Sequence, residues 1–278
     1  MADTIEKELT EPYRFNEISA AATLRTFAGF GDAPEPGEPL PDFDLMTTDG
    51  RRVRKAEFVG RRPLLVSFAS LSCPMTAAAS PVLTRLFEKF GRYVAFMSVY
   101  VREAHPGDEI PQATDRDEKL NHAVAYQRRD SIPWTVAVDE LDGDFHLKMG
   151  AHPNAAFIVD DGGNVVYRSL WSTHEGGLER ALEALVSGRA PSPSESKPVV
   201  APMLSAIGCM SETLEEAGPE ARRQARRKLA PVYGLSRVAR VFSPLPPAGR
   251  GAAAIGAVGV GVFGLIKAIG AATRSRRR

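Results

Sequence analysis

The chain has 278 residues, enough for one domain of about 150 to 200 residues with extensions, and its 44% hydrophobic content can fill a core. The net charge of +1 excludes a surface that is basic overall, so we expect no nucleic-acid partner. Two cysteines exclude a disulfide framework, which fits a reducing compartment. The polar, acidic N-terminus lacks the pattern of a secretory signal.

The N-terminal part is expected to form an extension over residues 1–40. Residues 1–30 have the pattern of an amphipathic helix, and the proline-rich stretch that follows is typical of a linker or cover segment. Within 43–53, two short strands are predicted around Asp49-Gly50, because Asp-Gly between apolar runs is a strong hairpin signal.

The central part, residues 41–188, alternates strand and helix patterns. The predicted strands are 64–68, 94–101, 135–138, 155–160 and 165–167, and the predicted helices are 74–90, 116–129 and 174–188. A helix between two buried strands implies parallel pairing, whereas the last two strands form an antiparallel hairpin. The order β-α-β-α-β-β-α predicts an α/β fold with a central mixed sheet flanked by helices.

The C-terminal part is predicted to be a helical tail. Residues 189–202 form a Pro/Ser linker that should end the globular domain, and 203–278 form the basic tail, with a charged helix over 211–229. The run 251–272, at about 22 residues, is long enough to span a bilayer, although glycines weaken its hydrophobicity. A cytoplasmic-facing protein anchored to a membrane by this run and a loosely packed or disordered tail are both consistent with it.

Cys73 is the candidate nucleophile, because this lone cysteine stands where a buried strand gives way to a helix. The free N–H groups and the dipole at a helix start favour a thiolate, so we expect a pKa below about 8.5. Pro74 suits the first helical position. Ser72 and Thr76 are candidate hydrogen-bond partners of the sulfur. The alternative is a buried, inert cysteine.

The element order, the position of Cys73 and the proline at 81 resemble the thioredoxin fold over residues 40–188. His152-Pro153, directly before a predicted strand, resembles the cis-proline that lies beside the active cysteine of that fold. The resemblance therefore implies a cis bond there, and a substrate groove formed by Pro74, Thr76 and Pro153.

The segment Glu103-Ala104-His105-Pro106 follows the second core strand and resembles the iodothyronine deiodinases. That family carries selenocysteine before a proline at the strand end where Cys73 stands. The resemblance implies Cys73 as nucleophile and His105 as the active-site histidine, with Glu103 completing the motif. The family's auxiliary cysteine corresponds to Leu71 and the second thioredoxin thiol to Thr76, so an external thiol reductant is implied.

The segment from Ser70 to Pro74 also resembles the Thr/Ser-x-x-Cys-Pro motif of the peroxiredoxins. The proline that those proteins carry seven residues before the cysteine is Val66 here. Arg102 and Arg129 are candidates for the arginine that accompanies the motif.

The function expected from these residues is that of a single-cysteine thiol oxidoreductase. The Cys73 thiolate attacks a peroxide, a disulfide or a halogenated small molecule, and an external thiol regenerates it. Deiodination of thyroid hormone is implied by resemblance only. The alternatives are a non-catalytic thioredoxin-like binding module and a membrane-tethering protein. No cofactor and no metal are expected, since the histidines lack ligand spacing, and Cys209 is expected to be an unpaired thiol.

Overall fold

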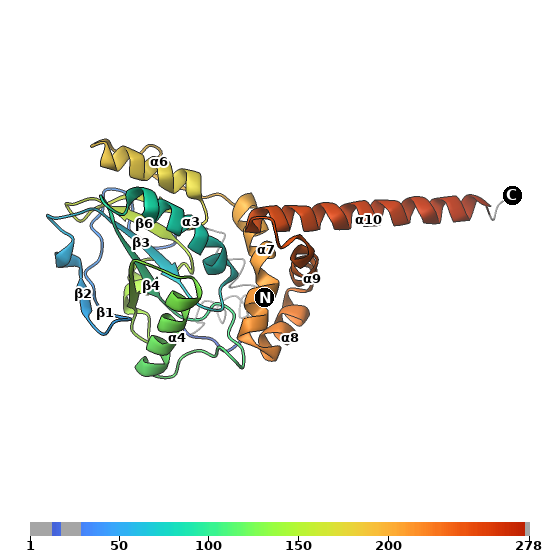
Figure 1. Ribbon diagram of the computed structural model, residues 1–278, viewed down its shortest axis with the longest axis horizontal. Helices are drawn as coiled ribbons and strands as arrows, with labels where there is room; N and C mark the ends of the chain where they lie inside the picture. The colour runs from blue at the N-terminus through green and yellow to red at the C-terminus, as the bar shows by residue number, and fades with distance from the viewer. Residues whose placement is uncertain (1–12, 18–28, 276–278) are drawn as a thin grey trace, which may run out of the picture.

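The computed structural model describes residues 13–17 and 29–275 (Figure 1). In this part of the chain, eight strands form one sheet in the order β2-β1-β5-β4-β3-β6-β7-β8. The strands are β1 (Asp44–Thr47), β2 (Arg52–Arg54), β3 (Leu64–Ala69), β4 (Ala95–Tyr100), β5 (Thr135–Val138), β6 (Ala156–Val159), β7 (Val165–Ser169) and β8 (Glu195–Ser196). The predicted hairpin at Asp49-Gly50 is confirmed as the antiparallel pair β1 and β2.

The helices lie between and after these strands. They are α3 (Pro74–Phe90), α4 (Arg116–Arg129), α5 (Asp144–Lys148), α6 (Glu175–Val186), α7 (Val200–Ala217), α8 (Pro219–Lys228), α9 (Ala230–Ala239) and α10 (Pro247–Ser275), with 3-10 turns at Lys55–Glu57 and Arg240–Phe242. The short α5 was not predicted, because its five residues are too few to show a helical period.

The centre of the sheet has the predicted mixed topology. Strand β3 pairs in parallel with β4, and β4 in parallel with β5, through the crossover helices α3 and α4. On its other side β3 pairs antiparallel with β6, and β6 with β7. This is the thioredoxin-like arrangement expected from the sequence.

The sheet has an apolar core on each face, because successive side chains of a strand point to opposite faces. Leu65 of β3 belongs to the core beneath α3, α4 and α6, whereas Val66 and Phe68 belong to the core that includes Phe43 and Phe145. All six residues of β3 are therefore buried, which explains why the strand reads as a continuous apolar run. The carboxyl ends of β3 and β4 meet at one edge of the sheet, where the functional side chains gather.

The predicted linker 189–202 contains regular structure. β8 pairs in parallel with β7 and extends the sheet, and α7 begins within the same stretch, at Val200. Helix α7 packs on α3 and contributes Met210 and Leu214 to the core under α3. The chain therefore folds back on the domain after residue 189, while the proposed domain boundaries stay predictions.

The single charged helix predicted over 211–229 is wrong, because α7 ends and α8 begins inside it. Gly218 has φ of +107°, a conformation that side chains other than glycine rarely adopt. Pro219 follows at the first position of α8, where its fixed φ suits a helix start. A Gly-Pro pair thus breaks the run of helix-forming residues.

The predicted cis bond at His152-Pro153 is also wrong: among the described residues, the cis peptide bond is Ser192-Pro193. The chain turns two residues earlier, at Gly150 and Ala151, which both have positive φ. A trans bond then suffices to bring the chain into β6.

Two predictions concern the ends of the chain. The helix predicted over 1–30 lies mostly outside the described residues, and residues 13–17 form bends. Helix α10 runs outward from the remaining helices (Figure 1). Within the part of the chain that the structure describes, no helix is both long and apolar enough to cross a membrane, so the predicted segment 251–272 is not supported.

Candidate active site

Cys73 occupies the N-cap of α3, with Pro74 at the first position of the helix. The N–H groups of Met75 and Thr76 and the Thr76 hydroxyl act on the thiol and favour its charged form, although the sulfur accepts no capping hydrogen bond from the helix start. The Thr76 hydroxyl oxygen also accepts the N–H of Ser70 (3.2 Å), so that this side chain is fixed between the two ends of the loop. The helix start therefore places N–H groups near the sulfur, but without a capping hydrogen bond to it.

The prediction of a lowered Cys73 pKa is nevertheless wrong for this conformation. The residue is 2% exposed, and burial raises the pKa of the thiol more than the nearby donor groups of Thr76 and Met75 lower it. The negative charge of Glu103 adds to the increase. The thiol is therefore protonated at neutral pH in the closed site.

Side chains from β4 and α4 hold the loop that leads to Cys73. The Leu71 N–H donates to the Tyr100 hydroxyl (3.2 Å), and the Leu71 carbonyl accepts from Arg129 Nη1 (2.9 Å). The Cys73 N–H donates to the Ser70 carbonyl (3.3 Å). Because its backbone groups have fixed partners, the loop presents the sulfur in one orientation.

Glu103 is a buried carboxylate, 1% exposed, that is bound from both sides. Its Oε2 accepts the N–H of Ser72 (2.9 Å) and the Ser72 hydroxyl (2.6 Å), and its Oε1 accepts the Tyr100 hydroxyl. Gln112 bonds both the N–H (3.0 Å) and the carbonyl (2.7 Å) of Glu103. The carboxylate therefore ties the motif after β4 to the loop before Cys73.

His105 contacts the residue next to the nucleophile. Its N–H donates to Ser72 Oγ (3.0 Å), and its Nδ1 lies 3.1 Å from the Ser72 carbonyl oxygen. Since a carbonyl only accepts, Nδ1 carries the proton and Nε2 is a free acceptor, buried without a partner among the described residues. Burial lowers the pKa of His105 to about 4, so the ring is neutral. We expected a proton donor or a partner for the thiolate, but this neutral ring can only accept at Nε2.

Pro153 lies at the same end of the sheet, in the loop before β6. The neighbouring Asn154 donates from Nδ2 to the carbonyl of Phe68 (3.2 Å), and the N–H of Phe68 donates to Ala155 (3.2 Å). The loop therefore lies beside the end of β3, from which the chain continues to Cys73.

The model of the iodothyronine deiodinase family matches residues 20–176, more than half of the chain. The chain belongs to this family.

Curated relatives agree with this deiodinase assignment. A thyroxine 5-deiodinase of Gallus gallus is 28% identical over 136 residues, which cover 45% of this chain and 52% of the relative. One of Ovis aries is 26% identical over 163 residues, covering 53% and 56%. The chain spans about half the length of the curated deiodinases that it matches.

Solved structures of thiol-disulfide proteins are also similar, at low identity. A thiol:disulfide interchange protein of the thioredoxin family from Chlorobium tepidum has 17% identity and a TM-score of 0.42, covering 55% of this chain and 97% of that one. A thiol-disulfide oxidoreductase from Bacteroides fragilis has 18% identity and a TM-score of 0.37, covering 47% and 89%.

Part of the polar network around Glu103 in this deiodinase-family chain was not predicted from the sequence. Tyr100 and Gln112 bind Glu103, and the only signal available was their position at the end of β4 and shortly after the motif. Of the two candidate arginines, Arg129 binds the loop before Cys73 through the Leu71 carbonyl. Arg102 instead donates to the carbonyl of Tyr13 (2.6 Å) and stacks on its ring.

The second cysteine does not form a disulfide with the first. Cys73 and Cys209 are both free, and Cys209 is buried on α7. Burial raises the pKa of the Cys209 thiol to about 12.

Proposed function

We propose that the protein is a single-cysteine thiol oxidoreductase in which Cys73 attacks a halogenated, disulfide or peroxide substrate and an external thiol regenerates it. The observation that carries the proposal is the position of Cys73 at the N-cap of α3, where the N–H groups of Met75 and Thr76 and the Thr76 hydroxyl favour the thiolate. A structural cysteine has no need of donors, whereas a thiolate is stabilised by them.

Burial of the thiol implies that the reaction begins with removal of a proton. The neutral His105 ring lies against the loop that carries Cys73 through Nδ1, has its free lone pair at Nε2, and is the candidate base. Glu103 acts through Ser72. Its carboxylate accepts a hydrogen bond from the Ser72 hydroxyl, and the oxygen of that hydroxyl accepts one from the backbone N–H of His105. Glu103 is therefore a positioning residue.

A substrate with a carbon-halogen bond reacts in three steps. The Cys73 sulfur forms a bond to the halogen while the carbon-halogen bond breaks, and the carbon keeps the electron pair and takes the proton released from Cys73. A first external thiol forms a mixed disulfide with Cys73 and releases the halide and a proton. A second external thiol releases Cys73, so that two thiols are oxidised to one disulfide.

The relatives named thyroxine 5-deiodinase suggest an iodinated aromatic compound as substrate. Leu71 stands where the family has an auxiliary cysteine, so regeneration depends on thiols from outside the chain. Disulfides and peroxides are the other electrophiles that a lone thiolate of this kind attacks.

The test is a dithiothreitol-dependent assay of the full chain with thyroxine, a small aromatic disulfide and hydrogen peroxide. We expect turnover of at least one of them, a loss of about 100-fold or more in Cys73→Ser, and a loss of about 100-fold in His105→Ala. Cys209→Ser is the matched control and should keep the wild-type rate. Turnover by Cys73→Ser, or none by the wild type, would contradict the proposal.

A thioredoxin-like binding module is the second candidate, and the burial of Cys73 favours it. In that case the loop around Pro153 docks a partner and the thiol stays unmodified. Trapping with iodoacetamide at pH 8 distinguishes the two: a module leaves Cys73 unlabelled until the chain unfolds, whereas an enzyme exposes it in the folded state.

A further inference from the structure

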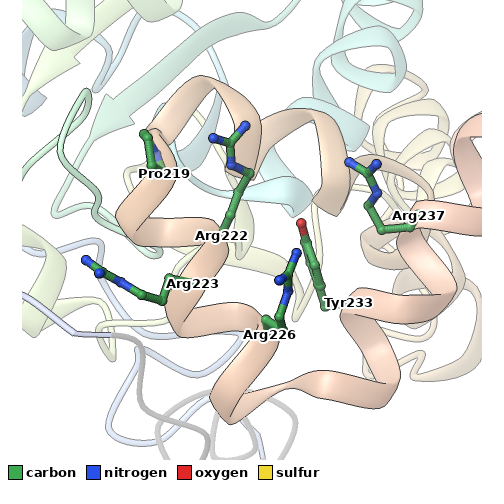
Figure 2. Close-up of a pocket in the computed structure, with 6 residues that line it drawn as sticks. All are labelled: Pro219, Arg222, Arg223, Arg226, Tyr233 and Arg237. Carbon is green, nitrogen blue, oxygen red and sulfur yellow. The ribbon is translucent and has the colours of Figure 1, made fainter.

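Helices α8 and α9 border a partly open pocket of about 490 Å³, and four of its six lining residues are arginines (Figure 2). This volume is within the range of small-molecule sites in proteins. The lining residues are Pro219, Arg222, Arg223, Arg226, Tyr233 and Arg237. The pocket lies outside the Cys73 site and has no part in the chemistry proposed there.

The arginines of the pocket are only partly neutralised. Arg222 and Arg226 form no ion pair within the part of the chain that the structure describes, whereas Arg223 pairs with Glu220. Arg237 donates to Glu215 at 2.8 Å. Like charges four residues apart on a helix repel each other, so this arrangement lowers stability unless an anion lies between them.

Apart from Arg223, which points away from the others in Figure 2, the polar ends of these side chains face one space. Figure 2 shows the guanidinium groups of Arg222 and Arg237 and the hydroxyl of Tyr233 extending into the same opening, with Arg226 beside the Tyr233 ring. Tyr233 is 7% exposed and belongs to the core cluster that also contains Ala221. The floor of the pocket is therefore fixed by packing.

The N-terminal end of α8 is not available to bind an anion in this pocket. The first free N–H of the helix, that of Glu220, donates to Asp108 Oδ1 at 2.8 Å, and a Cβ on Gly218 would lie 2.3 Å from the same oxygen. The helix start is thus already bound, by the loop that follows the Glu103-to-Pro106 motif. What remains for a ligand is the guanidinium groups and the phenol.

We propose that this pocket binds a soluble ligand through at least two linked phosphoryl groups. Guanidinium groups bind phosphate oxygens through two parallel hydrogen bonds, and Arg222, Arg226 and Arg237 bring three of these groups to the pocket from two helices. The Tyr233 hydroxyl adds a neutral donor. A diphosphate or triphosphate moiety fits both the charge and the volume.

The test is isothermal titration of the full chain with sodium tripolyphosphate at 50 and 200 mM salt. We expect saturable binding with one site, weakened at the higher salt concentration. In Arg222→Gln/Arg226→Gln, the affinity should fall about tenfold or more. Both side chains are at least partly exposed, so the variant should fold, and circular dichroism checks this.

The matched control is Arg92→Gln/Arg227→Gln, which removes the same two charges from exposed positions outside the pocket. It should keep the wild-type affinity within about twofold. An equal loss in both double variants, or no saturable binding, would overturn the proposal, because either result means diffuse surface charge.

Vesicles separate a soluble ligand from a lipid. Sedimentation with phosphatidylcholine vesicles, with and without phosphatidic acid, should show no binding that depends on Arg222 and Arg226. Binding to the acidic vesicles without binding of tripolyphosphate would overturn the assignment to a soluble ligand and place the phosphoryl groups on a lipid headgroup.

Discussion

Ser72 is the residue through which the two halves of the candidate site communicate. Its hydroxyl donates to Glu103 and accepts from the N–H of His105, and its carbonyl accepts from His105 Nδ1. The sequence pointed to Ser72 as a partner of the Cys73 sulfur, which is not where its hydroxyl lies. Only the pairing of β3 with β4 places Glu103 across from Ser72, and this long-range geometry is absent from a local motif.

The neutral state of His105 predicts a specific loss of stability in acid. Its pKa is about 4 when folded and about 6.5 when unfolded, so the unfolded chain binds the extra proton as the pH falls below about 6.5. Between pH 7.5 and 5.0, the free energy of unfolding should fall by about 2 kcal/mol more for the wild type than for His105→Asn. Urea titrations at the two pH values measure the difference.

The comparison between the two chains at each pH cancels the other histidines, including His146, whose pKa burial also lowers. A pH dependence that is the same in wild type and His105→Asn would mean that the ring is solvated and able to take up a proton when folded. It would also remove the basis for its role as an acceptor.

At the scale of elements, the junction between α7 and α8 packs against the loop that follows the Glu103-to-Pro106 motif. A Cβ on Gly107 would lie 2.1 Å from the carbonyl oxygen of Ala217 and 2.9 Å from the Cβ of Ala221. The Glu109 N–H donates to the same carbonyl of Ala217 (3.1 Å). The loop that carries His105 and the C-terminal helices are therefore in direct backbone contact.

We expect Gly107→Ala to force these two elements apart. Overpacking of this kind costs about 1 to 3 kcal/mol, measured as the free energy of unfolding in urea. The matched control is Gly234→Ala in α9, where nothing lies within 4 Å of the added Cβ. That change should be neutral or stabilise by up to about 1 kcal/mol, because alanine favours the helix. Equal effects of both substitutions would mean that the loop and helices do not touch in solution.

At the scale of the whole molecule, the C-terminal helices and the sheet share one core. Leu214 of α7 and Tyr233 of α9 belong to the same buried cluster as Leu83 and Leu86 of α3. Strand β8, which directly precedes α7 in the chain, pairs with β7 and so also connects this part of the chain to the sheet. This continuity predicts that the described helices and the sheet unfold together.

Leu214→Ala should therefore lower a single unfolding transition in calorimetry. Deleting a fully buried leucine side chain costs about 2 to 5 kcal/mol, because a cavity remains. Val200→Ala, in the same helix at a position 72% exposed, should change little. A second transition at a lower temperature in Leu214→Ala would show instead that the tail unfolds as a separate unit, as the predicted linker at 189–202 implies.

The sequence alone determined the long helices and the strands of the central domain, though not the short α5, and the junction that carries Cys73. Buried strands, an amphipathic helix and a proline after the cysteine are local patterns, and the bounds of α3 and α4 follow from them. The motif from Glu103 to Pro106 pointed to the family in the same way. Its helices and strands needed no distant partner to be recognised.

Tertiary structure decided the electrostatics of the site and the fate of the tail. The pKa values of Cys73 and His105 depend on burial, which is set by how many distant segments pack over them. The packing of α7 on α3, and the arginines that α8 and α9 bring together, likewise arise from contacts far apart in sequence. Periodicity reports which face of a segment is apolar, and only the assembled fold determines what covers it.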